Sequence, residues 1–303
     1  MSNYSESDAR MINARFIDKI ERGGELIKDA EVNVTSFIRD KLREEAFCRQ
    51  IITPQTITSD QLDRDAYTDK PKKVVEKEPD SKATWLSFRG MPSNQYFTGP
   101  RYEIFFGKIS SPTFVKSIHE LKTYENDIRQ ILSDNSVKDI QEQEDSKFME
   151  TCNAIALAAG GVQDLDYSMA GGLTKENFLE SRKSLRTLRV PHGISLMSQS
   201  TAEDVLKWDA HDIGDNAATL QYEKGLVQAT IYGTKVLYTI KNDLVPDGTI
   251  YHFGTESFLG KFFFLQDATV YIKHERDIIS FDSYEVLGVG IGNTKGVVRV
   301  KFY

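Results

Sequence analysis

The chain has 303 residues with a formal net charge of -7, and 40% of the residues are hydrophobic. This composition is typical of a soluble globular protein, and the two cysteines exclude a disulfide scaffold. The excess of acidic residues argues against a protein that wraps nucleic acid by neutralising its phosphates. The polar N-terminus has no signal-peptide pattern, and no apolar run reaches the roughly 18 residues of a membrane helix. We therefore expect a protein that is made in, and works from, a cytoplasm.

Residues 1–35 are polar, and Gly23 and Gly24 interrupt them. This favours a flexible or draped arm with a short helix near Ala9–Glu21. Ser36 is a good helix N-cap, and apolar residues recur at helical spacing after it. The sequence therefore predicts a helix that begins at Ser36 and ends before Pro54, followed by an extended connector.

The segment Asp63–Thr113 is the most unusual part of the chain. Its first half mixes lysines with acidic residues, and its second half is rich in aromatic residues. It is too long and too charged for an ordinary loop, and too aromatic for a disordered linker. We predict an extended hairpin that reaches off the body, with its tip at Gly90–Gly99. Such an arm is unstable alone, so it implies a partner surface.

The longest predicted helix begins at Ser136. Residues Phe114–Leu132 suit one or two helical segments, and Ser133–Asn135 break that pattern. Ser136 and Asp139 then resemble a capping box, and one apolar stripe continues to Gly160, where C-cap chemistry ends the helix. About 23 residues at the helical rise give roughly 34 Å. A helix of this length with one narrow stripe needs a sheet or loop along its whole length.

Beyond Gly161 the pattern changes to mixed helix and strand. Thr174 caps a helix through Leu188, His192–Ser198 is a short strand, and Thr201 with Asp204 caps a helix that ends near Trp208. Strands dominate after Gly225, over residues 226–240, 249–254, 262–275 and 285–303, with turn chemistry at Val245–Gly248. Because the strands are segregated late in the chain, we predict the α+β class.

Few residues suggest chemistry. Gly288–Gly296 superficially resembles a phosphate-binding loop, but the helix that such a loop requires cannot follow it, so a strand hairpin turning at Asn293–Gly296 is predicted. His192 beside Ser195 is interpreted as a strand end. An acidic and histidine cluster is weighed as a weak cation site, although such clusters commonly mark solvated loops; it comprises Asp209, His211, Asp212 and Asp215. No catalytic, metal-binding or cofactor-binding residue is assigned.

A basic face is predicted on one helix, at Arg182, Lys183, Arg186 and Arg189. It could contact an anion or nucleic acid, although a solvated or subunit-contacting face is the more common use of a charge run. Lysines and glutamates alternate in the first half of the segment 63–113. Mixed signs suit salt bridges to a neighbouring copy better than they suit phosphate binding.

The order of these segments resembles the major capsid protein of tailed double-stranded-DNA bacteriophages, the Hong Kong-type coat fold that encapsulin shells also use. The segment SFIRDKLREEAFCRQII leads through ITPQTITSDQLDRD to the extended loop, and SVKDIQEQEDSKFMETCNAIALAAGG resembles the long spine helix. The segments NFLESRKSLRTLRVPHGISLMSQSTAEDVLKW and VPDGTIYHFGTESFLGKFFF are similar to the axial part of coat proteins. The resemblance implies a division into an N-terminal arm and helix (1–62), an extended hairpin loop (63–113), a peripheral domain with the spine helix (114–160), an axial domain (161–262), and C-terminal strands returning to the peripheral domain (263–303).

The resemblance implies a structural protein without cofactors or catalysis, which self-assembles into pentamers and hexamers of an icosahedral phage head enclosing double-stranded DNA. Scaffolding, portal and decoration proteins would be its other partners, with packaged DNA contacted without sequence specificity and with no membrane. Its location would be the virion capsid, assembled in the host cytoplasm. Two alternatives are left open: an encapsulin-type compartment shell, and a soluble metal- or ligand-binding enzyme that uses the loop Asp209–Asp215.

Overall fold

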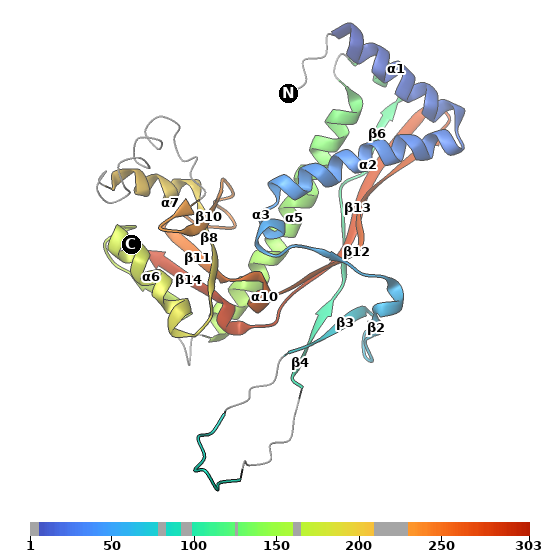
Figure 1. Cartoon of the computed structure of the whole chain (residues 1–303). Coiled ribbons are helices and arrows are strands. Elements are labelled where there is room, and N and C mark those ends of the chain that lie inside the picture. The colour runs from blue at the N-terminus through green and yellow to red at the C-terminus, as the bar shows by residue number, and fades with distance from the viewer. Residues whose placement is uncertain (1–5, 78–82, 92–98, 125–126, 160–164, 209–229) are drawn as a thin grey trace.

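The computed structural model describes residues 6–77, 83–91, 99–124, 127–159, 165–208 and 230–303. A long β-ribbon with helices along one face forms one part, and a more compact sheet forms another (Figure 1). A loop projects away from both parts. The predicted α+β class is confirmed. In the described part of the chain, no helix is long and apolar enough to cross a membrane.

The ribbon consists of β12 (Gly260–Glu275) and β13 (Ile278–Ile291), which pair antiparallel along their length. β5 (Gly107–Ser110) and β6 (Phe114–Ser117) pair with β13, and β1 (Gln55–Thr56) pairs with β12. Alternate residues of β13 are buried from Ile279 to Leu287. This period of two means that one face of the ribbon is turned to a core.

Three helices cover that face: α1 (Glu6–Arg22), α2 (Glu25–Glu45) and α5 (Ile128–Ala159). Their apolar side chains meet those of the ribbon in one buried cluster, which includes Phe16, Ile17, Ile20, Val34, Ile38, Ile140, Val270, Ile272, Ile279 and Phe281. A second cluster continues under α3 (Phe47–Ile51), where Phe148 of α5 is fully buried beside Phe47 and Phe253. Cys48 and Cys152 are both buried, and neither forms a disulfide.

The N-terminal segment is a helical hairpin, so the prediction of a draped arm with a helix beginning at Ser36 was wrong. Gly23 and Gly24 have φ values of 70° and 64°, a conformation that glycine adopts without strain, and they make the turn between α1 and α2. Ser36 lies inside α2, where its hydroxyl donates to the Asn33 carbonyl at 3.0 Å. The few apolar residues of the segment fall on one helical face, and this face packs on the ribbon. This packing stabilises the helices although the segment is polar in composition.

The long helix α5 begins at Ile128 and has 32 residues, so its predicted start at Ser136 was also wrong. Residues 114–132 instead contain β6, the short helix α4 (Ile118–Leu121) and the first turn of α5. Ser117 and Glu120 form a capping box at α4. Ser133 and Ser136 are buried, and burial of α5 on the ribbon outweighs the turn preference of Ser133–Asn135.

The second sheet has six strands in the order β7-β14-β11-β8-β10-β9. Helices α6 (Lys175–Thr187) and α7 (Gln199–Glu203) pack against it. The predicted strand His192–Ser198 and the Thr174 cap of α6 are confirmed. Ser198, and not Thr201, caps α7. The strands are β7 (Asp166–Met169), β8 (His192–Ser198), β9 (Thr230–Ile231), β10 (Thr234–Thr239), β11 (Thr249–Gly254) and β14 (Val297–Phe302).

The last strand does not follow the predicted path. β14 lies between β7 and β11 in the six-stranded sheet, whereas β12 and β13 lie in the ribbon. Residues 263–303 were expected to return together to the peripheral part, but β14 lies in the other sheet from β12 and β13. The turn at η3 (Thr294–Gly296) is present, but it passes the chain from one sheet to the other and makes no hairpin. Short helical turns lie in three other connections: η1 (Ser59–Gln61), η2 (Asp204–Lys207) and α10 (Glu256–Leu259).

Candidate assembly interface

The extended loop begins in a small sheet of its own. β2 (Asp63–Arg64), β3 (Pro71–Glu76) and β4 (Arg101–Phe105) pair antiparallel, and the pairing ends at Glu76 opposite Arg101. The predicted hairpin is therefore present at its base. Part of the predicted tip, residues 92–98, lies outside the described residues.

Charged side chains fix this small sheet. The Lys72 ammonium lies 2.7 Å from Glu103 and 3.2 Å from Asp65. Hydrogen bonds from Thr68, with smaller contributions from Lys72 and the Tyr67 backbone, lower the pKa of Asp65 to about 2. Lys72, one of the charges that were expected to reach a neighbouring copy, thus forms its ion pairs within the chain, at the loop base.

Glycines near the end of β13 lie against the base of the loop. Ile104 of β4 is 1% exposed and packs on the face of β13 that the helices leave open. A methyl group on Gly288 would lie 2.9 Å from the Ile104 side chain, and one on Gly292 would lie 2.5 Å from Tyr102. Gly290 is tighter still against Ile104. The glycine run that resembles a phosphate loop therefore serves as a groove for β4.

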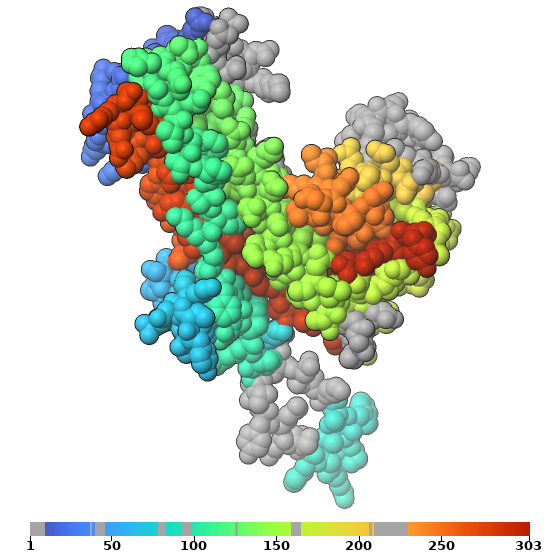
Figure 2. All heavy atoms as spheres, turned by 180° about the vertical axis from the view of Figure 1, so that it is seen from behind, coloured from blue at the N-terminus to red at the C-terminus, as the bar shows by residue number. Residues whose placement is uncertain are grey.

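The distal part of the loop carries large apolar side chains that are exposed in the described structure. Trp85 is 100% exposed, Phe88 105% and Met91 90%. A turn lies between Ser87 and Gly90, in which the Gly90 amide donates a hydrogen bond to the Ser87 carbonyl at 2.8 Å. In Figure 2 the teal segment that includes these residues stands clear of the rest of the surface. Such side chains on a soluble chain mark a surface that another molecule covers.

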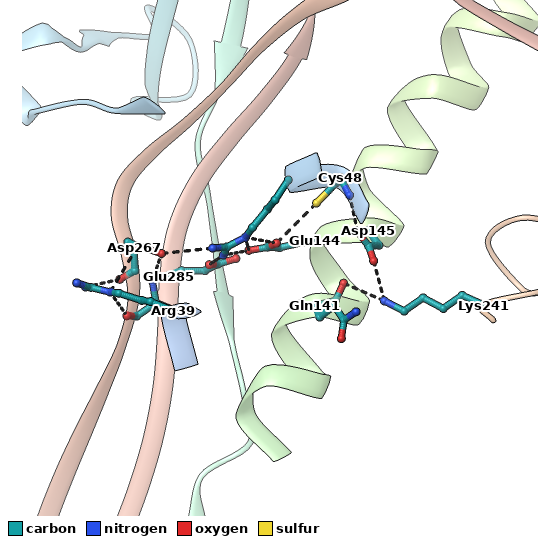
Figure 3. A network of polar contacts seen from close by, with 10 residues as sticks. Arg39, Cys48, Gln141, Glu144, Asp145, Lys241, Asp267 and Glu285 are labelled. Atoms are coloured by element: carbon teal, nitrogen blue, oxygen red, sulfur yellow. Dashed lines mark hydrogen bonds and ion pairs between the residues drawn. The ribbon is translucent and has the colours of Figure 1, made fainter. Parts of the chain in front are cut away.

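A buried polar network lies where the helices, the ribbon and the second sheet meet (Figure 3). The Arg49 side chain is 4% exposed and makes two bonds from Nε to Glu144, at 2.8 and 3.2 Å. Its Nη2 also contacts Glu285 at 3.0 Å. The Glu144 and Glu285 side chains are fully buried. Arg49 on α3 therefore joins α5 to β13.

Two buried carboxylates face one guanidinium, which leaves a negative charge uncompensated unless a proton is bound. Burial first, and then the neighbouring Glu144, raise the pKa of Glu285 well above its usual range. Among the described residues no donor reaches Glu285 Oε1. The surroundings therefore favour the protonated form of the Glu285 carboxyl.

Asp145 extends the network toward the second sheet. Its Oδ1 accepts from the Cys48 backbone at 3.1 Å, and its Oδ2 lies 2.7 Å from the Lys241 ammonium. Lys241 follows β10, so this ion pair ties the second sheet to α5. Burial raises the pKa of Asp145, and Lys241 opposes that effect.

The second sheet contains a histidine cluster that sequence reasoning missed. Ser195 Oγ lies 2.8 Å from His252 Nδ1 and 3.2 Å from His192 Nε2. Ser181 Oγ lies 2.9 Å from His252 Nε2. Burial, then Arg182 and Arg186, lower the pKa of His192 to about 4. Burial also lowers the pKa of His252 strongly. His192 begins β8, as predicted, but its partner His252 lies on another strand, and no local pattern marks the pair.

The candidate cation site lies outside the part of the chain that the structure describes. Asp209, His211, Asp212 and Asp215 all lie outside the described residues. Within the described ranges, no group of three histidine, cysteine, aspartate or glutamate side chains is arranged to hold a metal ion.

Known proteins match this chain in structure and not in sequence. No protein-family model matches the chain, and no curated protein sequence matches it. Solved structures do match. The mature capsid of bacteriophage PhiM1 has 8% sequence identity and a TM-score of 0.57, over 85% of this chain and 87% of that one. The capsid of the cyanophage P-SCSP1u has 10% identity and a TM-score of 0.58, over 84% and 86% of the two chains. The chain has the tailed-phage capsid fold.

The capsid fold extends beyond phages among the matching structures. A virus-like particle from Pyrococcus furiosus has 11% identity and a TM-score of 0.52, over 89% of this chain and 98% of that one. At such identities the likeness concerns the fold. The resemblance drawn from the order of segments is thereby confirmed at the level of the capsid fold.

Proposed function

We propose that this chain is the major capsid protein of a tailed phage and assembles with itself into pentamers and hexamers of an icosahedral shell around double-stranded DNA. The observation that carries the proposal is the loop 63–113. Its base is fixed on β13 at Ile104, while Trp85 and Phe88 at its distal end are fully exposed. The capsid fold supports the same role.

In this proposal the distal loop lies over the peripheral domain of an adjacent subunit, and its aromatic side chains are buried there. Long arms bury areas of about 2,000 Å² and above in obligate assemblies. Contacts between different faces of identical subunits close into rings, as pentamers and hexamers require. The implied division into domains and the absence of catalysis are part of the proposal.

The proposal also covers partners and location. Scaffolding, portal and decoration proteins would contact the shell, and no membrane would be involved. The shell would be assembled in the host cytoplasm and retained in the virion. An acidic chain with a net charge of -7 is compatible with DNA that is driven into the shell, because the coat need not attract it as a whole.

An encapsulin-type compartment is the second candidate. The match to the virus-like particle from Pyrococcus furiosus, which covers 98% of that chain, favours keeping it. The contents of purified shells separate the two candidates. A phage head contains DNA, whereas a compartment of the second kind contains a protein cargo.

Negative-stain microscopy of the expressed chain tests self-assembly directly. We expect closed shells from the wild type and none from a loop variant with Trp85→Ser, Phe88→Ser and Met91→Ser. The matched control replaces three exposed apolar residues outside the loop: Val32→Ser, Leu157→Ser and Ile240→Ser, which are 67%, 64% and 79% exposed. Circular dichroism checks that both variants fold. A wild type that stays monomeric or dimeric at all concentrations, or normal shells from the loop variant, would contradict the proposal.

A further inference from the structure

Helix α6 packs on the second sheet (Figure 1), and three arginines lie within it or just after its end. Arg182 and Arg186 are four residues apart in α6, which places them on one side of the helix, and Arg189 follows just after the helix ends at Thr187. Arg186 and Arg189 are exposed, and Arg182 is half-buried. These three residues form what we call the arginine row.

The arginine row has no carboxylate partner among the residues that the structure describes. Among the described residues, no carboxylate lies within ion-pair distance of any of its three guanidinium groups, whereas the neighbouring Lys183 pairs with Glu180. Arg182 donates to the Tyr232 carbonyl at 3.2 Å, but its Nε is buried and has no described acceptor. Burial and the positive charge of Arg186 lower the pKa of Arg182. These cations repel one another in the isolated chain.

Arg189 occupies a position that costs backbone strain. The φ angle of Arg189 is 59°. The Arg189 amide donates a hydrogen bond to the Arg186 carbonyl at 2.9 Å, and the Val190 amide donates one to the Leu185 carbonyl at 3.0 Å. This is the left-handed position after a helix end, where glycine is the usual residue. An arginine here stabilises the helix terminus less than glycine would, which makes its side chain a candidate for a functional role.

We propose that the arginine row binds the phosphate backbone of duplex nucleic acid. The inference rests on the proposed function in that the duplex would be the packaged DNA. A row of positive charges fits a partner whose surface is uniformly negative, and guanidinium groups match phosphates in geometry. A second copy of this chain carries both signs, with 38 basic and 45 acidic residues. The core of a protein interface would also need apolar side chains. Between residues 165 and 208, the described chain exposes no large hydrophobic side chain.

The affinity of the purified, unassembled chain for DNA tests the arginine row. The probe is a fluorescent duplex of about 20 base pairs of mixed sequence, titrated between about 20 and 150 mM NaCl. The variant is Arg182→Gln, Arg186→Gln and Arg189→Gln. The control removes the same charge at three exposed lysines that form no ion pair with the described residues: Lys138→Gln, Lys235→Gln and Lys295→Gln. Each lost phosphate contact reduces the steepness of the plot of log affinity against log salt concentration by about 0.9. The slope of the arginine-row variant should therefore be less steep by about 2.7, and the slope of the control should not change.

A single substitution separates binding from folding. Arg189→Gly should keep or raise the melting temperature, because glycine suits the left-handed position, yet reduce the salt slope by about 0.9. Equal DNA binding by the wild type and the arginine-row variant would overturn the inference. It would also be overturned if the wild type bound no DNA while the arginine-row variant failed to form shells, since the row would then be a contact between copies. Failure of the proposed function would appear separately, as absence of shells from the wild type.

Discussion

Arg49 Nη2 and Glu285 Oε2 lie 3.0 Å apart in the interior, and this contact joins α3 to β13. Glu144 of α5 binds the same guanidinium. Burial lowers the pKa of Arg49, but the Glu144 bond and the surrounding carboxylates outweigh it and hold that pKa above its ordinary value. One cation thus ties three elements together, and Glu285 supplies a site for a proton.

Replacing Glu285 by Gln should flatten the dependence of stability on pH. Because the folded pKa of Glu285 is raised above its ordinary 4.5, the folded state holds a proton that the unfolded state releases. The contribution of this proton to the free energy of unfolding is complete below pH 4.5. It is lost as pH rises through the folded pKa, at up to about 1.4 kcal/mol per pH unit. Urea unfolding from acid to alkaline pH measures it. The exposed Glu142→Gln is the control, and equal slopes in all three proteins would refute the assignment.

Replacing Gly290 by Ala should loosen the loop base. The new methyl group would overlap Ile104, and overpacking of this kind costs about 1–3 kcal/mol. Gly107→Ala is the matched control, since a methyl group added at Gly107 would have nothing within 4 Å. Limited proteolysis of the loop and the melting temperature report the effect. Two variants with identical cleavage rates would show that β4 does not depend on the glycine groove.

A charge at Phe148 should prevent folding. Phe148 is 0% exposed and packs between Phe47 and Phe253, so Phe148→Asp places an unpaired carboxylate in the core. Leu157→Asp on the same helix should be tolerated, because Leu157 is 64% exposed. Soluble expression and circular dichroism compare the two. A folded Phe148→Asp protein would mean that the packing of α5 is misassigned.

Acid should weaken the second sheet through its histidines. The folded pKa of His192 is about 4 and that of His252 is also depressed, so the unfolded state binds more protons below pH 6.5. Their contribution to stability is present above pH 6.5 and falls as pH drops toward 4, by up to about 1.4 kcal/mol per pH unit for each histidine. Chemical unfolding at several pH values tests this. His192→Gln should reduce the slope, and an unchanged slope would exclude His192 as a source.

Local patterns predicted those elements whose ends carry strong turn chemistry. The strand His192–Ser198 follows Pro191, and the strand beginning at Thr249 follows a Pro–Asp–Gly turn, and both have the predicted bounds. The start of α5 could not be predicted, because Ser133–Asn135 favour a turn locally and only burial on the ribbon keeps them helical. The same holds for Ser36 inside α2.

The polar network could not be predicted from sequence either, since Arg49 and Glu144 are 95 positions apart and follow no motif. The glycine groove did have a signal. Gly288, Gly290 and Gly292 recur with a period of two, which places them on one face of a strand. Glycines at that spacing indicate that another backbone approaches closely, an interpretation that fits β13 better than a phosphate loop or a plain hairpin.

The position of β14 has a consequence for biosynthesis. Residues 297–302 come last among the strands, yet they fill the gap between β7 and β11, with parallel pairing to the first and antiparallel pairing to the second. A nascent polypeptide that still lacks them on the ribosome therefore has two open strand edges and an incomplete second sheet. In the proposed assembly, a subunit can offer a complete second sheet to its neighbours only after translation has passed β14.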